Sequence, residues 1–153
     1  IMSTEKTLIT VKREPRTVLL CLDSSDHSKK AFDYAIQLFA PGDTVYVLTV
    51  LEGDKEDLVT EEYVKETFLE KHFGPAFKAA NITWTPMVRT SSSPADTICE
   101  AAEAEKVGLI VLGASKKPTH IFNKIGSVAS KVLAKSACDV FVVKKWHGEK
   151  KSS

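Results

Sequence analysis

Residues 109–127 read LIVLGASKKPTHIFNKIGS, and this stretch decides the fold. Apolar residues run from Leu109 into Gly113, a basic segment follows, and Gly126-Ser127 opens a run with helical spacing. Glycine lets the backbone come close to an anion, and a helix N-terminus offers N–H groups and a partial positive charge. The stretch therefore predicts a phosphate-binding corner between a strand and a helix.

Apolar strands and amphipathic helices alternate along the rest of the chain. The predicted strands are Thr17–Leu22, Thr44–Leu51, Thr83–Arg89, Leu109–Gly113 and Asp139–Lys144. The predicted helices are Ser28–Phe39, a long helix with apolar positions from Leu69 to Ala80, a helix beginning at Ser93-Pro94, and Ser127–Ser136. This alternation predicts an α/β sandwich of three layers, with a parallel sheet and right-handed crossovers.

Particular residues refine these elements. Pro86 lacks the N–H that a central strand needs, so its strand is predicted at a sheet edge. Ser93 is predicted to cap its helix through the side chain, with Pro94 at the first helical position. In the last helix Val132 and Leu133 are predicted to face the core, and an additional strand is possible at Thr7–Val11.

The composition and net charge of the chain favour some classes of protein and argue against others. The chain has 153 residues, of which 43% are hydrophobic and 27% charged, so it predicts one globular domain. Its apolar runs are too short to span a membrane, and a net charge of +1 argues against a nucleic-acid partner. Three cysteines without paired spacing indicate buried, reduced thiols. With no apolar leader near the start, these features predict a cytoplasmic protein.

The sequence offers little for catalysis. No histidines or cysteines have ligand spacing, so no dedicated metal site is predicted. No Ser-His-Asp arrangement has local support, and no residue is proposed as a nucleophile. An enzyme is therefore the least favoured class.

The ends of the predicted strands gather the candidate binding residues. Ligands bind parallel sheets at the carboxyl ends of strands, where the strand order reverses. This rule predicts that Asp23, Val50 and Gly113 share one crevice. Asp23 alone would be interpreted as a turn or capping carboxylate, and the glycine-rich corner after the fourth strand favours a binding role instead.

Two segments carry a family resemblance. VLLCLDSSDHSKKAF and VLGASKKPTHIFNKIGSVASKVLAKSACDVFVVK resemble the universal stress protein family over about residues 16–145. Members share a pattern of Gly, two residues, Gly, nine residues and Gly-Ser or Gly-Thr. Here Gly113, Lys116 and Gly126-Ser127 keep the spacing, with Lys116 in place of the second glycine. The resemblance implies an extension over 1–15, a domain over 16–146 and a flexible tail over 147–153.

The resemblance also implies a fold and a ligand. Family members have five parallel strands, often in the order 3-2-1-4-5, as in adenine nucleotide alpha hydrolases. Their ATP-binding branch holds adenine near strands one and two and the phosphates on the glycine loop. ATP or AMP, with or without Mg²⁺ near Asp23, is the implied ligand. The implied binding residues are Leu22, Asp23, Val50, Gly113, Lys116, Gly126, Ser127 and Val128.

Three hypotheses remain open from the sequence. The favoured one is a nucleotide-binding stress protein that acts through ligand-dependent conformation or association. The second is a nucleotide-free dimeric interaction protein on the same fold, because Ala129 and Lys116 depart from the ATP-binding pattern. The third is a slow ATPase. The fifth strand, predicted at an edge by the family order, is predicted to form a homodimer through Val140, Phe141, Val142 and Val143.

Overall fold

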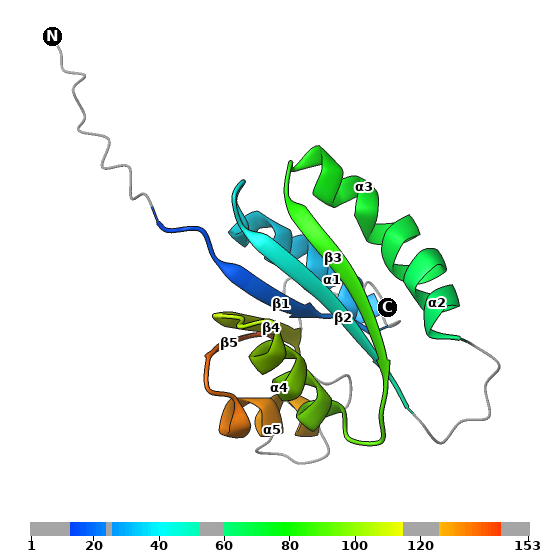
Figure 1. Cartoon of the computed structure of the whole chain (residues 1–153), viewed down its shortest axis with the longest axis vertical. Helices are drawn as coiled ribbons and strands as arrows, with labels where there is room; N and C mark the ends of the chain where they lie inside the picture. The colour runs from blue at the N-terminus through cyan, green and yellow to red at the C-terminus, as the bar shows by residue number, and fades with distance from the viewer. Residues whose placement is uncertain (1–12, 24–25, 53–59, 115–125, 145–153) are drawn as a thin grey trace, which may run out of the picture.

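The computed structural model describes residues 13–23, 26–52, 60–114 and 126–144. Within them, five strands form one parallel sheet in the order β3-β2-β1-β4-β5 (Figure 1). The strands are β1 (Thr17–Cys21), β2 (Thr44–Leu51), β3 (Thr83–Thr90), β4 (Leu109–Gly113) and β5 (Asp139–Val143). The helices are α1 (Asp26–Ala35), the 3-10 helix η1 (Ile36–Leu38), α2 (Glu61–Val64), the π-helical η2 (Lys65–Glu70), α3 (Lys71–Ala79), α4 (Pro94–Ala104) and α5 (Ser127–Lys135). The predicted fold class and strand order are confirmed.

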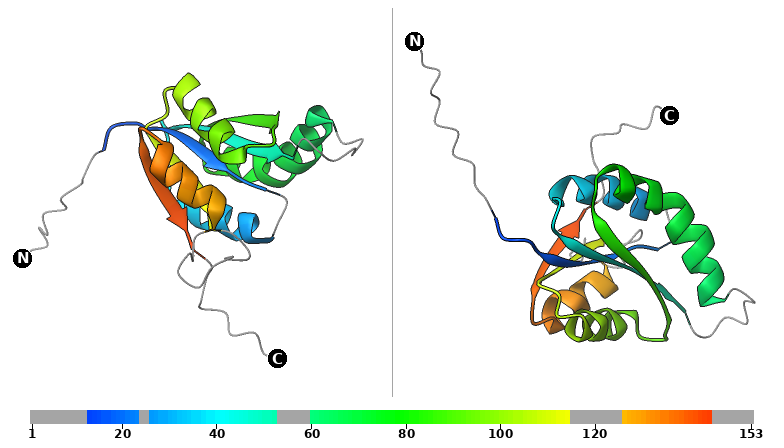
Figure 2. Two further views of the ribbon diagram at one scale, coloured as in Figure 1. Left: turned by 90° about the horizontal axis from the view of Figure 1, so that it is seen from below. Right: turned by 45° about the horizontal axis from the view of Figure 1, so that its top comes forward.

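Helices cover both faces of the sheet, which gives the three predicted layers. The helices α1 and α3 lie on one face, and α4 and α5 lie on the other (Figure 2, right). Alternate residues of β1 serve the two cores: Val18 and Leu20 pack toward α1 and α3, whereas Leu19 packs toward α4 and α5. All three side chains are fully buried, as the central strand of such a sheet requires. None of the described helices is long and apolar enough to cross a membrane.

The predicted long helix is interrupted by a π-helical segment. Its apolar positions Val64, Phe68, Phe73 and Phe77 pack in one core, spaced by four, five and four residues. An α-helix turns every 3.6 residues, and the i→i+5 bonding of a π-helix accommodates the five-residue step. The segment η2 lies at that step, so the whole helix keeps one apolar face toward β2 and β3.

Three local predictions differ from the structure. Ser93 occupies the cap position of α4, but its side chain forms no capping bond, and its N–H donates to Ser91 Oγ at 3.0 Å. Leu133 is 46% exposed, because α5 packs through Ala129 and Val132 and Leu133 lies one position further round the helix. The strand β1 ends at Cys21, although the Leu22 N–H still donates to the Leu48 carbonyl at 2.9 Å. The stretch Thr7–Val11 lies outside the described residues.

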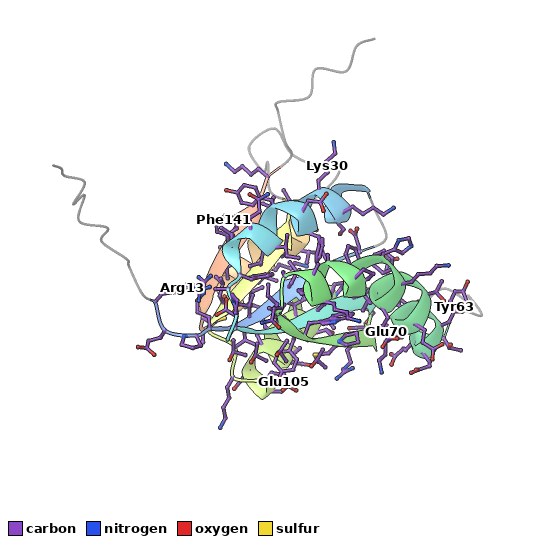
Figure 3. All side chains as sticks on the ribbon, turned by 90° about the horizontal axis from the view of Figure 1, so that it is seen from above. Arg13, Lys30, Tyr63, Glu70, Glu105 and Phe141 are labelled. Carbon is purple, nitrogen blue, oxygen red and sulfur yellow. The ribbon has the colours of Figure 1, made fainter. Side chains whose placement is uncertain are left out.

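The two edges of the sheet differ in sequence. The strand β3 forms one edge and contains Pro86, as predicted. The strand β5 forms the other edge, and its residues Val140, Phe141, Val142 and Val143 are each half-buried. The Phe141 ring stacks on Tyr34 of α1 at 6.1 Å between centroids, and Tyr34 is 44% exposed (Figure 3).

A buried ion pair closes the amino end of the sheet. Asp43 is 1% exposed, and its two carboxylate oxygens accept from Arg13 Nη1 at 2.8 Å and Arg13 Nη2 at 2.6 Å. The backbone N–H groups of Arg16 and Ala40 donate to the same carboxylate, each at 2.9 Å. Burial raises the pKa of Asp43, but these hydrogen bonds outweigh it and hold the pKa at about 2. The residues before β1 are thereby fixed to the turn that precedes β2.

Candidate functional site

A pocket of about 330 Å³ opens at the carboxyl ends of β1, β2 and β4, on the face that α4 and α5 cover. This is the sheet position where the order reverses between β1 and β4 and where ligands bind doubly wound folds. Its volume falls at the lower end of the usual range for small-molecule sites. The lining residues are Cys21, Leu22, Asp23, Ser28, Leu48, Val50, Glu52, Pro94, Ile98, Leu112, Gly113, Ala114, Ser127, Val128 and Ala129.

The inner wall of the pocket is apolar. Leu48 and Val50 are two apart on β2 and therefore point to the same face of the sheet. Pro94 and Ile98 are four apart on α4 and lie on the same side of that helix. All four line the pocket, so its wall between the sheet and α4 is apolar.

Two hydroxyl groups fix the rim where the chain leaves β1. Thr49, which is 3% exposed, donates from Oγ1 to the Leu22 carbonyl at 2.8 Å. Ser28, which is 7% exposed, accepts from the Asp23 N–H at 2.6 Å and donates to Asp23 Oδ1 at 2.8 Å. The Asp23 side chain itself is exposed at the pocket rim. The neighbouring strand and the following helix thus both hold residues 22–23.

The N-terminus of α5 forms the opposite rim. Gly126 precedes the helix with φ 86° and ψ 167°, a conformation that favours glycine. Its carbonyl accepts from the Ser130 N–H at 3.1 Å and from Ser130 Oγ at 2.7 Å. Gly126 has no side chain with which to cap this nine-residue helix, whose first residues Ser127, Val128 and Ala129 line the pocket. The positive end of the helix dipole therefore faces the cavity.

Gly113 lines the pocket, but a side chain at this position would point toward α1 and not toward a ligand. A Cβ atom at Gly113 would meet the Ala31 Cβ at 3.7 Å, which is ordinary contact with α1 rather than an obstruction of the pocket. The backbone continues from Gly113 to Ala114, whose N–H donates to the Val143 carbonyl of β5 at 2.8 Å. The pocket wall at the end of β4 is therefore tied directly to the β5 edge.

Charge is unevenly distributed around the cavity. Among the described residues that line it, Asp23 and Glu52 are carboxylates and none is a lysine or arginine. The positive potential that this part of the lining supplies comes from two helix N-termini, that of α5 at Ser127 and that of α4 at Pro94. A cation bound to an anionic ligand would be stabilised between that ligand and the carboxylates of Asp23 and Glu52.

Burial affects the pKa values of the three cysteines. Cys21, Cys99 and Cys138 are free and half-buried rather than fully buried. Burial raises the pKa of Cys21, with a smaller contribution from Cys99. Burial is also the main reason why the pKa values of Cys99 and Cys138 are raised. Neutral thiols are poor nucleophiles, and Cys21 is one of the residues that line the pocket.

The structure brings together most of the residues predicted to share a crevice. Leu22, Asp23, Val50, Gly113, Ser127 and Val128 line one pocket, and Gly126 adjoins it in the backbone. Lys116 lies outside the described residues. Sequence reasoning missed Thr49, Pro94 and Ile98. Alternation along β2 predicts which of its side chains share a face, and the four-residue spacing on α4 predicts that Pro94 and Ile98 share a side of that helix. Neither pattern predicts that β2 and α4 lie next to each other.

Comparison with known proteins agrees with this geometry. A family model, that of the universal stress protein family, matches residues 14–144. The chain belongs to the universal stress protein family. A universal stress protein of Thermus aquaticus, from the QAH/OAS sulfhydrylase 3′ region, is 30% identical over 136 residues, which cover 84% of this chain and 98% of that relative.

Solved universal stress proteins share the fold. A crystal structure of a universal stress protein in complex with cAMP is 25% identical, covers 86% of this chain and 98% of that chain, and gives a TM-score of 0.64. A universal stress protein family member from Arabidopsis thaliana with AMP bound is 16% identical, with coverages of 91% and 98% and a TM-score of 0.65. Both proteins therefore have the same fold as this one, and each was crystallised with an adenine nucleotide.

Proposed function

We propose that this universal stress protein binds an adenine nucleotide in the pocket between β1, β2, β4 and α5. The observation that carries the proposal is the pairing of an apolar slot with a helix N-terminus in one cavity of about 330 Å³. An adenine ring suits the slot, and a phosphate group suits the N–H groups of the helix. The family members crystallised with cAMP and with AMP support the same class of ligand.

The proposed pose follows the lining of the cavity. Adenine lies against Val50 and Ile98, where apolar side chains from β2 and α4 face one another. The phosphates lie at the N-terminus of α5, on the N–H groups of Ser127 and Val128. The ribose lies between them, beside Asp23 on the rim. In ATP, Mg²⁺ would reduce the repulsion between the outer phosphates and the carboxylates of the rim.

Ligand binding is proposed to act on association between chains. Gly113 and Ala114 line the pocket, Gly113 pairs with Val143 in the sheet, and the Ala114 N–H bonds the Val143 carbonyl. A nucleotide that contacts this corner therefore acts on residues bonded to β5. We propose a homodimer through β5, because its half-buried apolar residues and its place at the edge of the described sheet suit a second copy of the strand.

The test of binding is a pair of substitutions at Ser127. Proline is well tolerated at the first position of a helix, so Ser127→Pro removes one N–H donor and the hydroxyl while α5 remains. Ser127→Ala removes only the hydroxyl and is the matched control. Isothermal titration with AMP should show a loss of about tenfold or more for the proline variant beyond that of the alanine variant.

Adenosine provides the second control, because it has no phosphate. Its affinity should be the same in the unaltered chain and in both Ser127 variants. Equal AMP affinity for the proline and alanine variants would contradict the phosphate position. Absence of AMP, cAMP and ATP binding to the unaltered chain, with and without Mg²⁺, would contradict the proposed function and favour a nucleotide-free interaction protein. Release of ADP on incubation with ATP would show that the protein hydrolyses ATP as well as binding it.

A further inference from the structure

We infer that Ser28 is a positioning residue that sets the preference of this pocket for ribonucleotides over nucleotides without ribose hydroxyls. The inference rests on the proposed function and deepens it, because it concerns how the rim carboxylate is held. Ser28 is the third residue of α1 and lies in the wall of the pocket. Its sequence context suggests an ordinary capping serine, but its hydroxyl instead bonds back to Asp23.

The two hydrogen bonds between these residues fix both parts of Asp23. The backbone N–H of Asp23 donates to Ser28 Oγ at 2.6 Å, which holds the main chain at the end of β1. The Ser28 hydroxyl proton points to Asp23 Oδ1 at 2.8 Å, which fixes the rotation of the carboxylate. A serine hydroxyl has one proton, so both of its roles in this pair are defined. The carboxylate is thereby presented to the pocket in one orientation.

Burial makes this orientation rigid. Ser28 is 7% exposed, whereas Asp23 is exposed on the rim, so water does not readily replace the hydroxyl. Thr49 supports the same segment from the other side through its bond to the Leu22 carbonyl. A carboxylate held in place before the ligand arrives loses little conformational entropy on binding. It accepts a hydrogen bond from a sugar hydroxyl more strongly than a neutral acceptor does.

Ribose hydroxyls are the donors that such a carboxylate recognises. A ligand with ribose hydroxyls gains a charge-assisted hydrogen bond to this oriented carboxylate, and a ligand that lacks them does not. Asp23 follows β1, which lies between β2 and β4 in the sheet, and it lines the pocket where the proposed pose puts the sugar. Ser28 therefore acts on ligand choice through Asp23.

The experiment compares AMP with dideoxyadenosine monophosphate by isothermal titration. The unaltered chain should prefer AMP by about tenfold or more, and Ser28→Ala should weaken AMP about fivefold while changing the dideoxy ligand less than about twofold. Ser136→Ala is the control, because it removes a serine hydroxyl that donates to the Cys138 carbonyl and does not line the pocket. It should leave both affinities unchanged.

A double-substitution cycle separates positioning from a merely structural role. If Ser28 acts through Asp23, Ser28→Ala should have no further effect on AMP affinity in an Asp23→Ala background. An equal loss of both ligands in Ser28→Ala, or a full loss that persists in the Asp23→Ala background, would overturn the inference while leaving nucleotide binding intact. No AMP binding by the unaltered chain would overturn the proposed function as well, so the two failures are distinguishable.

Discussion

Asp43 provides the sharpest test of how the fold is held together. Its carboxylate accepts four hydrogen bonds, two from Arg13 and one each from the N–H groups of Arg16 and Ala40. Asp43→Asn replaces one oxygen by an NH₂ group, which then faces donors instead of offering them an acceptor. About two of the four bonds are lost, and each involves a charged group worth about 1.5–3 kcal/mol.

The expected destabilisation is smaller than the sum of these bonds. Arg13 is 33% exposed, so its guanidinium regains water when its partner is lost. We therefore expect Asp43→Asn to lower the free energy of unfolding at pH 7 by about 2–4 kcal/mol. Urea denaturation followed by circular dichroism measures this quantity. Asp33→Asn, the same change on the exposed surface of α1, is the control and should be within about 0.5 kcal/mol of the unaltered chain.

The pH dependence gives an independent readout. The pKa of Asp43 is about 2 in the folded chain, against an ordinary value of 3.8. Because the folded pKa is the lower one, this group stabilises the fold above pH 4, and its contribution of about 2 kcal/mol is lost as the pH falls from 4 to 2. The difference in stability between the unaltered chain and Asp43→Asn should therefore shrink over that interval. An unchanged difference from pH 5 to pH 2, or a loss below 0.5 kcal/mol at pH 7, would refute the reasoning.

Three further outcomes are expected. Val142→Lys should convert a dimer into a monomer in light scattering at micromolar concentration, because it places a charge in the β5 edge; a monomeric mass for the unaltered chain would contradict this. Lys116→Gly should weaken ATP binding by about 1–3 kcal/mol and AMP binding much less, because it removes an ammonium group that we propose bonds the outer phosphates; tighter ATP binding would show that the lysine obstructs. The thiols of the folded chain, Cys21 included, should react slowly with Ellman's reagent at pH 8 and rapidly in urea, since burial raises their pKa values; equal rates would contradict the burial argument.

Much of the fold was readable because its determinants are local. Continuous apolar runs mark strands that are covered on both faces, and Pro86 alone placed β3 at an edge. The crevice was predictable from topology, since parallel strands bring Asp23, Val50 and Gly113 to the same end of the sheet. The strand order itself came from the family resemblance, because alternation of elements does not specify which strands are neighbours.

The parts that sequence reasoning missed depend on contacts between distant segments. Thr49 reads as an ordinary strand residue until the Leu22 carbonyl, 27 residues earlier, is placed against it. Arg13 and Asp43 are 30 residues apart, and neither lies in a recognisable motif. Gly113 was predicted for the right place with an incomplete reason, since a Cβ there would face Ala31 and not the ligand space. Such pairings follow from three-dimensional packing, which a linear pattern does not encode.

The contrast between the two sheet edges has a consequence for the size of any assembly. Beside β3, an incoming strand would meet the ring of Pro86 where it needs an N–H donor. Beside β5, it would meet Val140 to Val143 with no proline in the strand. If the sheet extends only through β5, pairing of two chains occupies that edge in both of them, and no second edge remains for a third chain. Two copies joined through β5 would thus present only proline-blocked borders, and growth into fibrils would stop at the pair.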